Sequence, residues 1–483
     1  MAETNMKSKV LSGLFWKVME NGGTQGIQFI VSIILAKLLT PEEYGIVGLI
    51  TIFITIANVF VQNGFNTALI QKKNADDVDF SSVFYLSLGV AAVMYIILFA
   101  GAPFIASFYE EPELVLIVRV LAVTLFFGAV TSVQNAAVAR RMEFRGLFFA
   151  TLAAVIISGL LSIGMAYKGM GVWALVGQQI AYYFFLMIVL FITVSWKPKL
   201  LFSITRVKTL FSFGWKLLCS SLIDTVYNNI YGLVIGKAYN NEVLGYYNRG
   251  DQFPKLITNN LGIAIQSVML PAFSANQSDK QKVKSMVRRS IVTSSFVILP
   301  MMAGLIAVAE SMVLVILGEK WLPCVPFLQL MCVAYSFWPI HIANLQAINA
   351  MGRSDTFLKL EIIKKAVGVV GLIIGIGFNV YVLVILKAVI DFVCTFINAW
   401  PNKKLLDYSI VEQWKDILPS MAISIIMGVC AFFVQFVIHN ALICLVVQIV
   451  VGALVYIGLA KLFKMESFNY LLDIVKSKLG KSN

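Results

Sequence analysis

The sequence has few of the residues that hold metals or cross-link secreted folds. Only two histidines occur in 483 residues, His341 and His439, and no acids or thiols stand beside them at metal-ligand spacing. The cysteines lie almost all within or beside apolar stretches and form no CxxC pair. We therefore interpret all six as buried apolar residues rather than disulfides or ligands: Cys219, Cys324, Cys332, Cys394, Cys430 and Cys444.

Nucleotide-binding motifs and long polar segments are also missing. The chain contains neither a GxxxxGK[ST] loop nor a dinucleotide fingerprint, so we do not expect it to hydrolyse ATP itself. The connections between apolar runs are short, as at 195–209 and 276–290, and leave no room for a soluble catalytic domain. No catalytic residue, metal or bound cofactor is expected, and the chain is interpreted as a protein other than an enzyme.

Charge is scarce, and its distribution excludes nucleic acid as a partner. Charged residues make up 13% of the chain, 59% is hydrophobic, and the mean hydropathy is +0.85. The net charge of +13 comes from Lys and Arg placed in the gaps between apolar runs, whereas a nucleic-acid binder gathers them on one face or arm. This composition is typical of a polytopic membrane protein in contact with the lipid bilayer.

Apolar runs recur from one end of the chain to the other. Each is about 20 residues long, enough for a helix to cross a hydrocarbon layer of about 30 Å. The sequence therefore predicts an all-α membrane protein with about 14 transmembrane helices. The expected spans are 11–36, 45–70, 81–107, 115–138, 147–167, 172–194, 210–236, 251–275, 291–317, 324–350, 361–377, 380–400, 416–437 and 440–463.

The positions of Lys and Arg predict the orientation of these spans. Basic residues concentrate in both tails and in every second connection, whereas the opposite connections hold Lys37, Lys168, Lys237, Arg249 and Lys320. Short basic loops stay on the cytoplasmic side of a membrane. Both termini are therefore predicted to be cytoplasmic.

An internal repeat relates the two halves of the chain. The stretch from Phe15 to Gly48 returns in weakened form from Gly214, so that Trp16-Lys17 matches Trp215-Lys216 and Gly45 matches Gly245. Six predicted spans separate the copies, so both enter the membrane in the same direction. This predicts two pseudo-symmetric six-helix lobes, residues 1–200 and 201–405, followed by two C-terminal helices and a cytoplasmic tail in 406–483.

Polar residues form stripes on four of the predicted helices, two in each lobe. At 100° per residue, the polar positions of each helix fall within an arc of about 60–140°. Polar side chains in hydrocarbon are costly, so these faces should meet protein or water. We predict that they line a hydrated substrate cavity, formed by Lys17, Asn21, Gln25, Gln28, Asn58, Gln62, Lys216, Tyr227, Asn228, Lys255 and Asn259. Hydrogen bonding between helices is the alternative explanation.

The chemistry of this lining favours a sugar-containing cargo. Amides, hydroxyls and Tyr rings suit sugars, and Lys17, Lys216 and Lys255 can attract phosphate, although a lysine near a helix end can instead extend to the lipid headgroups. Glu20 and Asp224 are candidates for coupling transport to a proton or sodium gradient. Lys17 stands three residues from Glu20 and could neutralise it instead. Lys387 and Asp391, spaced i, i+4, are expected to form a structural pair.

Several motifs resemble bacterial polysaccharide exporters of the Wzx-like oligosaccharide flippase family, in its colanic-acid-exporter-like branch. They are SGLFWK at 12–17, QFIVSIILAKLLTPEEYGIVGL at 28–49, QNGFNTALIQ at 62–71, GWK at 214–216 and LGYYNRGDQFPKLITNNLG at 244–262. The resemblance implies the fold of the multidrug/oligosaccharidyl-lipid/polysaccharide exporter superfamily. It also implies transport of undecaprenyl-diphosphate-linked oligosaccharide across the bacterial inner membrane, for surface polysaccharide or O-antigen, alongside a polysaccharide polymerase and chain-length machinery.

Two other functions are compatible with a polytopic membrane protein. A cation-coupled multidrug exporter of the same superfamily needs an embedded acid in an apolar, aromatic cavity, for which Glu20 and Asp224 are the candidates. A membrane glycosyltransferase or polymerase should carry a sizeable extramembrane loop with acidic residues, which this sequence lacks.

Overall fold

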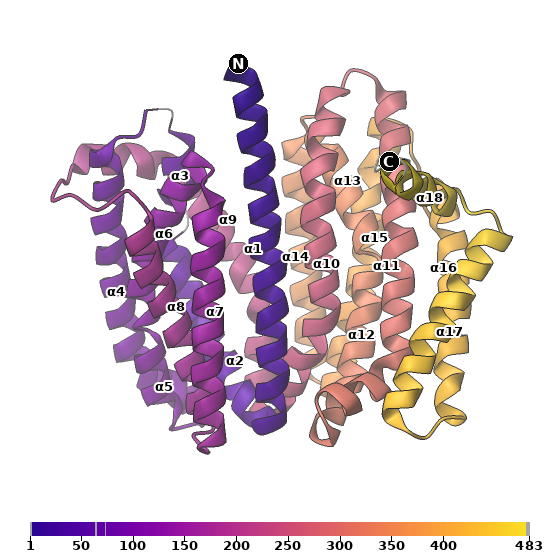
Figure 1. Cartoon of the computed structure of the whole chain (residues 1–483), viewed down its shortest axis with the longest axis horizontal. Coiled ribbons are helices and arrows are strands. Elements are labelled where there is room, and N and C mark those ends of the chain that lie inside the picture. Colours follow the sequence, from indigo (N-terminus) through magenta and orange to yellow (C-terminus); the bar gives the residue numbers. More distant parts are fainter. Residues whose placement is uncertain (1, 63–64, 73, 480–483) are drawn as a thin grey trace. The chain divides into compact units, whose positions relative to one another are not determined.

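A computed structural model describes residues 2–62, 65–72 and 74–479, and nearly all of them are helical (Figure 1). No strand occurs in these ranges. The chain divides into two compact units, Met1–Gly245 and Tyr246–Asn483. The predicted lobes, 1–200 and 201–405, are defined by the sequence repeat and not by contacts, and they remain a prediction.

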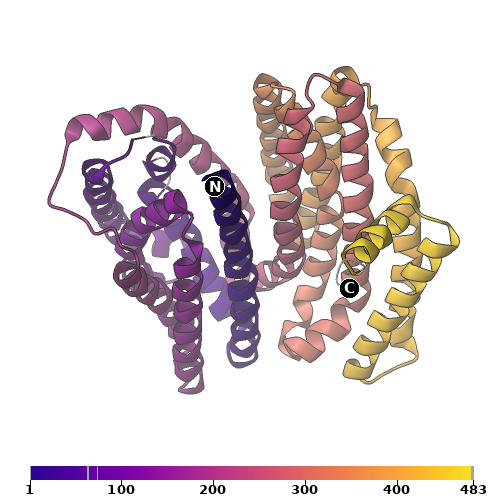
Figure 2. The same ribbon diagram turned by 45° about the horizontal axis from the view of Figure 1, so that its top comes forward.

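Unit 1 is built from nine helices and the start of a tenth. They are α1 (Ala2–Leu38), α2 (Pro41–Gln62), α3 (Phe65–Gln71), α4 (Asp77–Tyr109), α5 (Leu114–Leu121), α6 (Thr124–Arg141), α7 (Phe144–Tyr167), α8 (Val172–Thr193), α9 (Ile204–Ala238) and the first residues of α10 (Asn241–Ala275). Helix α1 packs on α7, which packs on α8, while α9 lies across α2, α3 and α4 (Figure 2).

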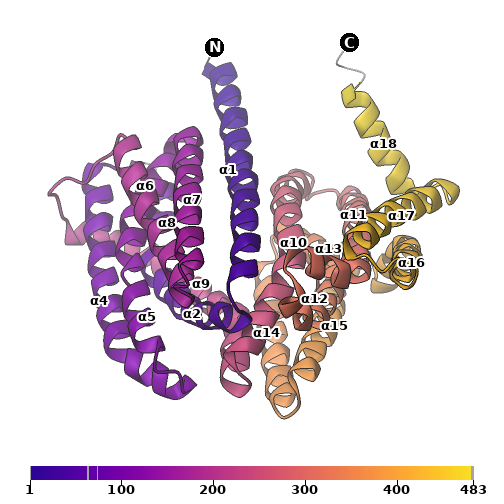
Figure 3. The same ribbon diagram turned by 60° about the horizontal axis from the view of Figure 1, so that its bottom comes forward.

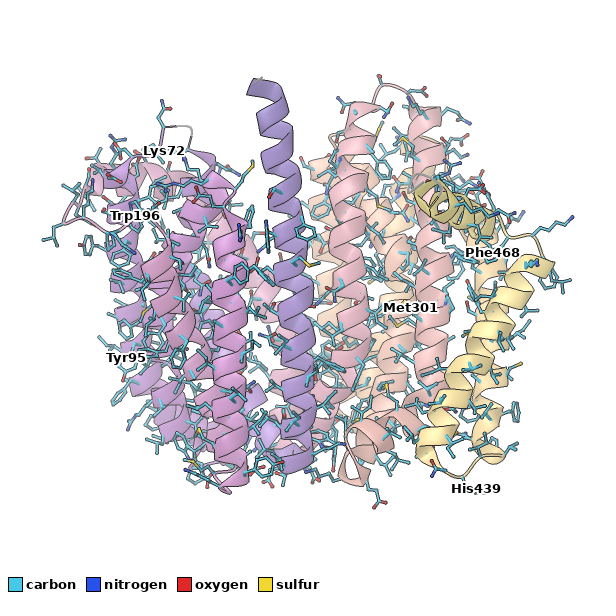
Figure 4. All side chains as sticks on the ribbon, in the orientation of Figure 1. Lys72, Tyr95, Trp196, Met301, His439 and Phe468 are labelled. Atoms are coloured by element: carbon cyan, nitrogen blue, oxygen red, sulfur yellow. The ribbon has the colours of Figure 1, made fainter. Side chains whose placement is uncertain are left out.

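Unit 2 contains the rest of α10 and the C-terminal helices. They are α11 (Lys280–Ile316), η1 (Glu319–Cys324), α12 (Val325–Ser336), α13 (Trp338–Ala350), α14 (Ser354–Ile376), α15 (Val380–Leu406), α16 (Ile410–Phe433), η2 (Val434–Phe436), α17 (Ala441–Leu462) and α18 (Glu466–Leu479). Helix α11 is central, because it packs on α12, α13, α16 and α17. His439 lies at the end of this unit opposite to α18 (Figure 4).

The all-α membrane fold predicted from the sequence is confirmed. Among the described residues, ten helical segments are long and apolar enough to cross a membrane. Four other long helices, α1, α9, α10 and α14, coincide with the remaining predicted spans but are more polar. The count of fourteen crossings therefore stays a prediction. Helix α18 was not predicted, because residues 466–479 are too polar to form a span.

Contacts within unit 1 place the basic connections at one end. Lys72 donates to the buried carboxylate of Asp79 at 2.6 Å, and Arg206 lies 3.4 Å from Asp76. Asp76 caps α4, and the backbone hydrogen bond from Asp79 lowers the pKa of its carboxyl. Arg140 donates to the Leu69 carbonyl at 3.1 Å. The loops after α3, α6 and α8 therefore meet, as the alternation of basic connections requires.

The other end of unit 1 carries the acidic turn after α4. Lys237 donates to Glu110 at 2.8 Å and lowers the pKa of that exposed carboxyl, while Asn241 donates to Glu111 at 2.7 Å. The hydroxyl of Tyr109 donates to the Leu233 carbonyl at 3.3 Å. These contacts join the ends of α4 and α9, so the connections of unit 1 sort into two opposite sets.

The prediction for the cysteines is correct for most positions. All six thiols are free, and Cys324, Cys332, Cys394 and Cys444 are buried. Cys219 is exposed on α9 and Cys430 is half-buried on α16, which corrects the expectation that every cysteine is buried. The apolar neighbours of Cys219 in the sequence indicate a membrane-spanning helix, but they do not determine which of its faces is covered.

Candidate functional site

Lys17 and Glu20 of α1 lie where α1 meets α7. The Lys17 ammonium donates to the Glu20 carboxylate at 2.6 Å and lies 5.8 Å from the centre of the Phe144 ring on α7. Trp16 packs against Phe148, with ring centres 5.6 Å apart. Glu20 is buried, so the pairing supplies its counter-charge. The alternative predicted for this pair, neutralisation of Glu20 by Lys17, is the arrangement observed.

Asn58 and Gln62 of α2 face another helix of unit 1. Gln62 donates to Asn58 at 3.0 Å, and both amides lie against Gly128 of α6, where a methyl group would approach them within 2.8–3.0 Å. Earlier on the same stripe, Thr51 accepts a hydrogen bond of 3.0 Å from Gln179 of α8. The polar stripe of α2 therefore forms hydrogen bonds and close contacts with α6 and α8 inside unit 1.

The remaining predicted residues of unit 1 differ in exposure. Gln25 and Tyr227 are half-buried, whereas Gln28, Lys216, Asp224 and Asn228 are exposed. The side chain of Asn21 lies outside the described part of the chain. The structure thus presents a largely exposed polar surface on α9 and a largely enclosed one on α2. The assignment of these residues to a substrate cavity remains a prediction.

Lys255 and Asn259 belong to unit 2, where both are exposed on α10. Lys255 lies 3.5 Å from Asp251, and the hydroxyl of Tyr335 on α12 donates to Asp251 at 2.9 Å. Lys387 on α15 lies 5.6 Å from the centre of the Tyr335 ring and donates to Asp391 at 3.0 Å. The predicted Lys387–Asp391 pair is therefore confirmed, and it belongs to a larger group of charges joining α10, α12 and α15.

Sequence reasoning missed Asp251 and Tyr335 as members of this group. Asp251 was overlooked because it begins the span 251–275, where an acid is unremarkable, and Tyr335 because a tyrosine in an apolar helix carries no charge. His341 lies 2.7 Å from the amide of Asn398 on α15.

Two buried sets of amides were also missed. In unit 2, Asn344 and Gln413 exchange two hydrogen bonds of 2.8 and 3.1 Å, and Asn402 donates to Asn344 at 2.6 Å. In unit 1, Gln134 on α6 is fully buried, and neither of its polar atoms has a hydrogen-bond partner among the described residues. Single amides in apolar runs give no sequence signal beyond their rarity, so periodicity alone does not single them out.

The arrangement of helices matches the fold of two solved membrane proteins. The chain superposes on the lipid II flippase MurJ in an inward closed conformation with a TM-score of 0.75 and 16% identity, covering 93% of this chain and 98% of that one. It also matches an inward-facing MATE family multidrug transporter of the MOP superfamily, with a TM-score of 0.60, 16% identity and coverage of 79% and 94%. These likenesses show the fold.

The chain belongs to the polysaccharide biosynthesis protein family, which it matches over residues 34–326. It is 24% identical to the teichuronic acid biosynthesis protein TuaB of Bacillus subtilis, covering 94% of this chain and 96% of TuaB. It is 24% identical to the succinoglycan biosynthesis transport protein ExoT of Rhizobium meliloti, over 69% and 68% of the two chains. It is 22% identical to the lipopolysaccharide biosynthesis protein WzxC of Escherichia coli, over 77% and 76%. The resemblance to polysaccharide exporters is confirmed.

Proposed function

We propose that this protein is a flippase that moves lipid-linked oligosaccharide across the bacterial plasma membrane for the synthesis of a surface polysaccharide. The observation that carries the proposal is the combination of a lipid II flippase fold over 93% of the chain with membership of a polysaccharide biosynthesis family. The names of TuaB, ExoT and WzxC support it, because all three refer to the synthesis or transport of polysaccharides.

The physical task of such a protein is to lower the cost of moving a polar headgroup through hydrocarbon. Burying a polar group without a partner costs roughly 2–7 kcal/mol, and an oligosaccharide diphosphate carries many such groups. The exposed amides of Asn228 on α9 and Asn259 on α10 can replace water at sugar hydroxyls, and Lys216 and Lys255, both exposed, can attract the diphosphate. The prenyl chain remains in lipid while the lobes alternate in their access to the two sides.

The proposed substrate is the undecaprenyl-diphosphate-linked repeat unit, delivered from the cytoplasmic to the periplasmic leaflet, with both termini of the protein in the cytoplasm. A polysaccharide polymerase and chain-length machinery would then consume the delivered units. The proposed driving force is a proton or sodium gradient acting through Glu20 or Asp224. Glu20 is buried and paired with Lys17 at 2.6 Å, whereas Asp224 is exposed. Asp224 is therefore the acid that an ion from water reaches more readily.

Deletion of the gene tests the proposal directly. We expect lipid-linked repeat units to accumulate facing the cytoplasm and surface polymer to be lost, with recovery of polymer when the gene is supplied on a plasmid. Normal polymer in a strain without any redundant flippase would refute the assignment. Measurement of the repeat unit by mass spectrometry and of surface polymer by gel electrophoresis distinguishes the two results.

The second candidate is a cation-coupled multidrug exporter, which the similarity in fold to a MATE transporter favours. Overexpression would then raise resistance to cationic dyes, whereas a flippase leaves susceptibility unchanged. The third hypothesis, a membrane glycosyltransferase or polymerase, loses support because the relative ExoT is named as a transport protein and the fold matches that of a lipid II flippase.

A further inference from the structure

Unit 2 contains an apolar groove that lies apart from the predicted substrate residues. Its volume is about 570 Å³, within the range of ligand-binding pockets. One wall is the face of α10 on which the lining residues recur every three or four positions. The other wall is the side of α11 that faces it. The lining residues are Leu261, Ile265, Met269, Ala272 and Phe273 on α10, Met286, Arg289, Ser290, Thr293, Ser294, Val297 and Ile298 on α11, and Tyr470 on α18.

The groove has one charged end and one apolar end. Helices α10 and α11 run antiparallel, so Phe273 and Met286 lie near one end and Leu261 and Val297 near the other. Arg289 stands at the first end. The Ser294 hydroxyl donates to the Ser290 carbonyl within α11, so the serine adds little polarity to the wall. A ligand that fits this groove must combine one anionic end with an apolar chain.

Helix α18 closes the charged end. The Arg289 guanidinium lies 4.9 Å from the centre of the Tyr470 ring. Phe468 and Leu471 pack against a buried cluster formed by Phe296, Ile423 and Ala460 (Figure 4). Helix α18 is foreshortened in Figure 1, whereas α11 runs nearly in the plane of the picture, and Figure 3 shows the length of α18 at an angle to α17. An amphipathic helix at this angle is typical of one lying in the membrane interface.

Arg289 is available to an anionic ligand, unlike its neighbour. Arg288 is held by Asp416 at 3.0 Å and by Glu466 at 3.3 Å. Arg289 is exposed, and in the part of the chain that the structure describes it forms no ion pair. Tyrosine and arginine side by side at a helix end are typical of the headgroup level of a bilayer.

The length of the groove matches the length of one lipid acyl chain. Its wall on α10 extends from Leu261 to Phe273, which corresponds to about 18 Å of helix at 1.5 Å per residue. One leaflet of hydrocarbon is about 15 Å thick, half of the bilayer core. An acyl chain of a membrane phospholipid, anchored at the headgroup level, spans this distance, whereas a long polyprenyl chain exceeds one leaflet.

We propose that the α10–α11 groove, closed by α18, binds one anionic phospholipid, with an acyl chain between the two helices and the phosphate beside Arg289 and Tyr470. The site is separate from the proposed transport function and holds whether or not oligosaccharide is the cargo. The bound lipid fills the space between α10 and α11 and fixes α18 at the interface.

Native mass spectrometry of the purified full-length protein tests the site. Phosphatidylglycerol and phosphatidylcholine with identical acyl chains are titrated separately, and bound lipid is counted. We expect phosphatidylglycerol to bind more tightly, and Arg289→Gln to weaken it about fivefold, as expected for one basic residue near a membrane surface. Lys282→Gln removes an exposed charge from the same helix end but outside the groove, and should leave binding unchanged.

A second variant tests the apolar part of the groove. Ala272→Phe places an aromatic ring in the groove beside α10. It should abolish lipid binding although Arg289 is intact. Equal weakening by Lys282→Gln and Arg289→Gln, or equal binding of the two phospholipids, would overturn the proposal. Undecaprenyl phosphate is the competitor: if it displaces phosphatidylglycerol at equimolar concentration, the occupant is a prenyl lipid and the assignment to phospholipid is wrong.

Discussion

At the scale of single residues, the buried amides of unit 2 have the clearest structural role. Gln413 is 1% exposed and exchanges hydrogen bonds with Asn344, which also accepts one from Asn402, so the three amides join α13, α15 and α16. Replacing Gln413 with Leu leaves the buried Asn344 amide short of a partner, at a cost of about 1–3 kcal/mol. We expect a lower thermal unfolding midpoint in detergent, measured by the fluorescence of the purified protein.

The control for this substitution is Gln277→Leu. Gln277 is exposed in the turn before α11 and lies outside the amide group, so the same chemical change should alter stability by no more than about 0.5 kcal/mol. If the two variants unfold at the same temperature, the amide group contributes nothing specific to the packing of these helices.

The pair Lys17–Glu20 provides a second prediction at this scale. Lys17→Met leaves the buried Glu20 carboxylate without its counter-charge, and the protein should become less stable than the double variant Lys17→Met/Glu20→Gln. The amount of folded protein in membranes, measured by size-exclusion chromatography after extraction, reports the difference. A double variant with less folded protein than Lys17→Met would show that Glu20 has other stabilising contacts and would contradict the prediction.

At the scale of elements, the repeat produces a reciprocal contact between the first turns of α2 and α10. A β-carbon on Gly45 would lie 1.7 Å from the Asn241 carbonyl oxygen, and one on Gly245 would lie 1.9 Å from the Pro41 carbonyl oxygen. Positions 41 and 241, like 45 and 245, correspond in the repeat. The clashing atoms belong to the backbone, so neither clash can be relieved by rotating a side chain. Gly45→Ala and Gly245→Ala should therefore each sharply reduce surface polymer and folded protein.

The matched control is Gly101→Ala in α4. This glycine is also helical and lies in unit 1, but a β-carbon there meets nothing within 4 Å. We expect normal polymer and slightly higher helix stability, since alanine is favoured over glycine by about 1 kcal/mol. Normal polymer from Gly45→Ala would show that the helix starts can separate at no cost to function.

At the scale of the whole molecule, the prediction to be tested is the orientation of the chain in the membrane. The basic connections after α3, α6 and α8 meet at one end of unit 1, and the acidic turn after α4 lies at the other. Since basic loops remain cytoplasmic, alkaline phosphatase fused after residue 111 should be active, and a fluorescent protein fused after residue 200 or at the C-terminus should fluoresce. The opposite pattern would invert the proposed direction of transport.

The sequence by itself determined the class of molecule, the positions of most long helices and the resemblance to the family. Runs of about 20 apolar residues can satisfy their backbone hydrogen bonds in lipid only as helices, so their existence follows from composition alone. The GWK and LGYYNRGDQFPKLITNNLG motifs indicate an exporter through their residues alone. The i, i+4 spacing of Lys387 and Asp391 was enough to predict their pairing.

Only the tertiary structure decided what each polar residue faces. Helical periodicity places Asn58 and Gln62 on one face of α2, but the neighbour of that face, Gly128 of α6, lies far away in the sequence. The same applies to Asp251 and Tyr335, and to the Asn344, Asn402 and Gln413 amides. A sequence records the direction of a side chain around its own helix, whereas the packing of helices decides which partner occupies that direction.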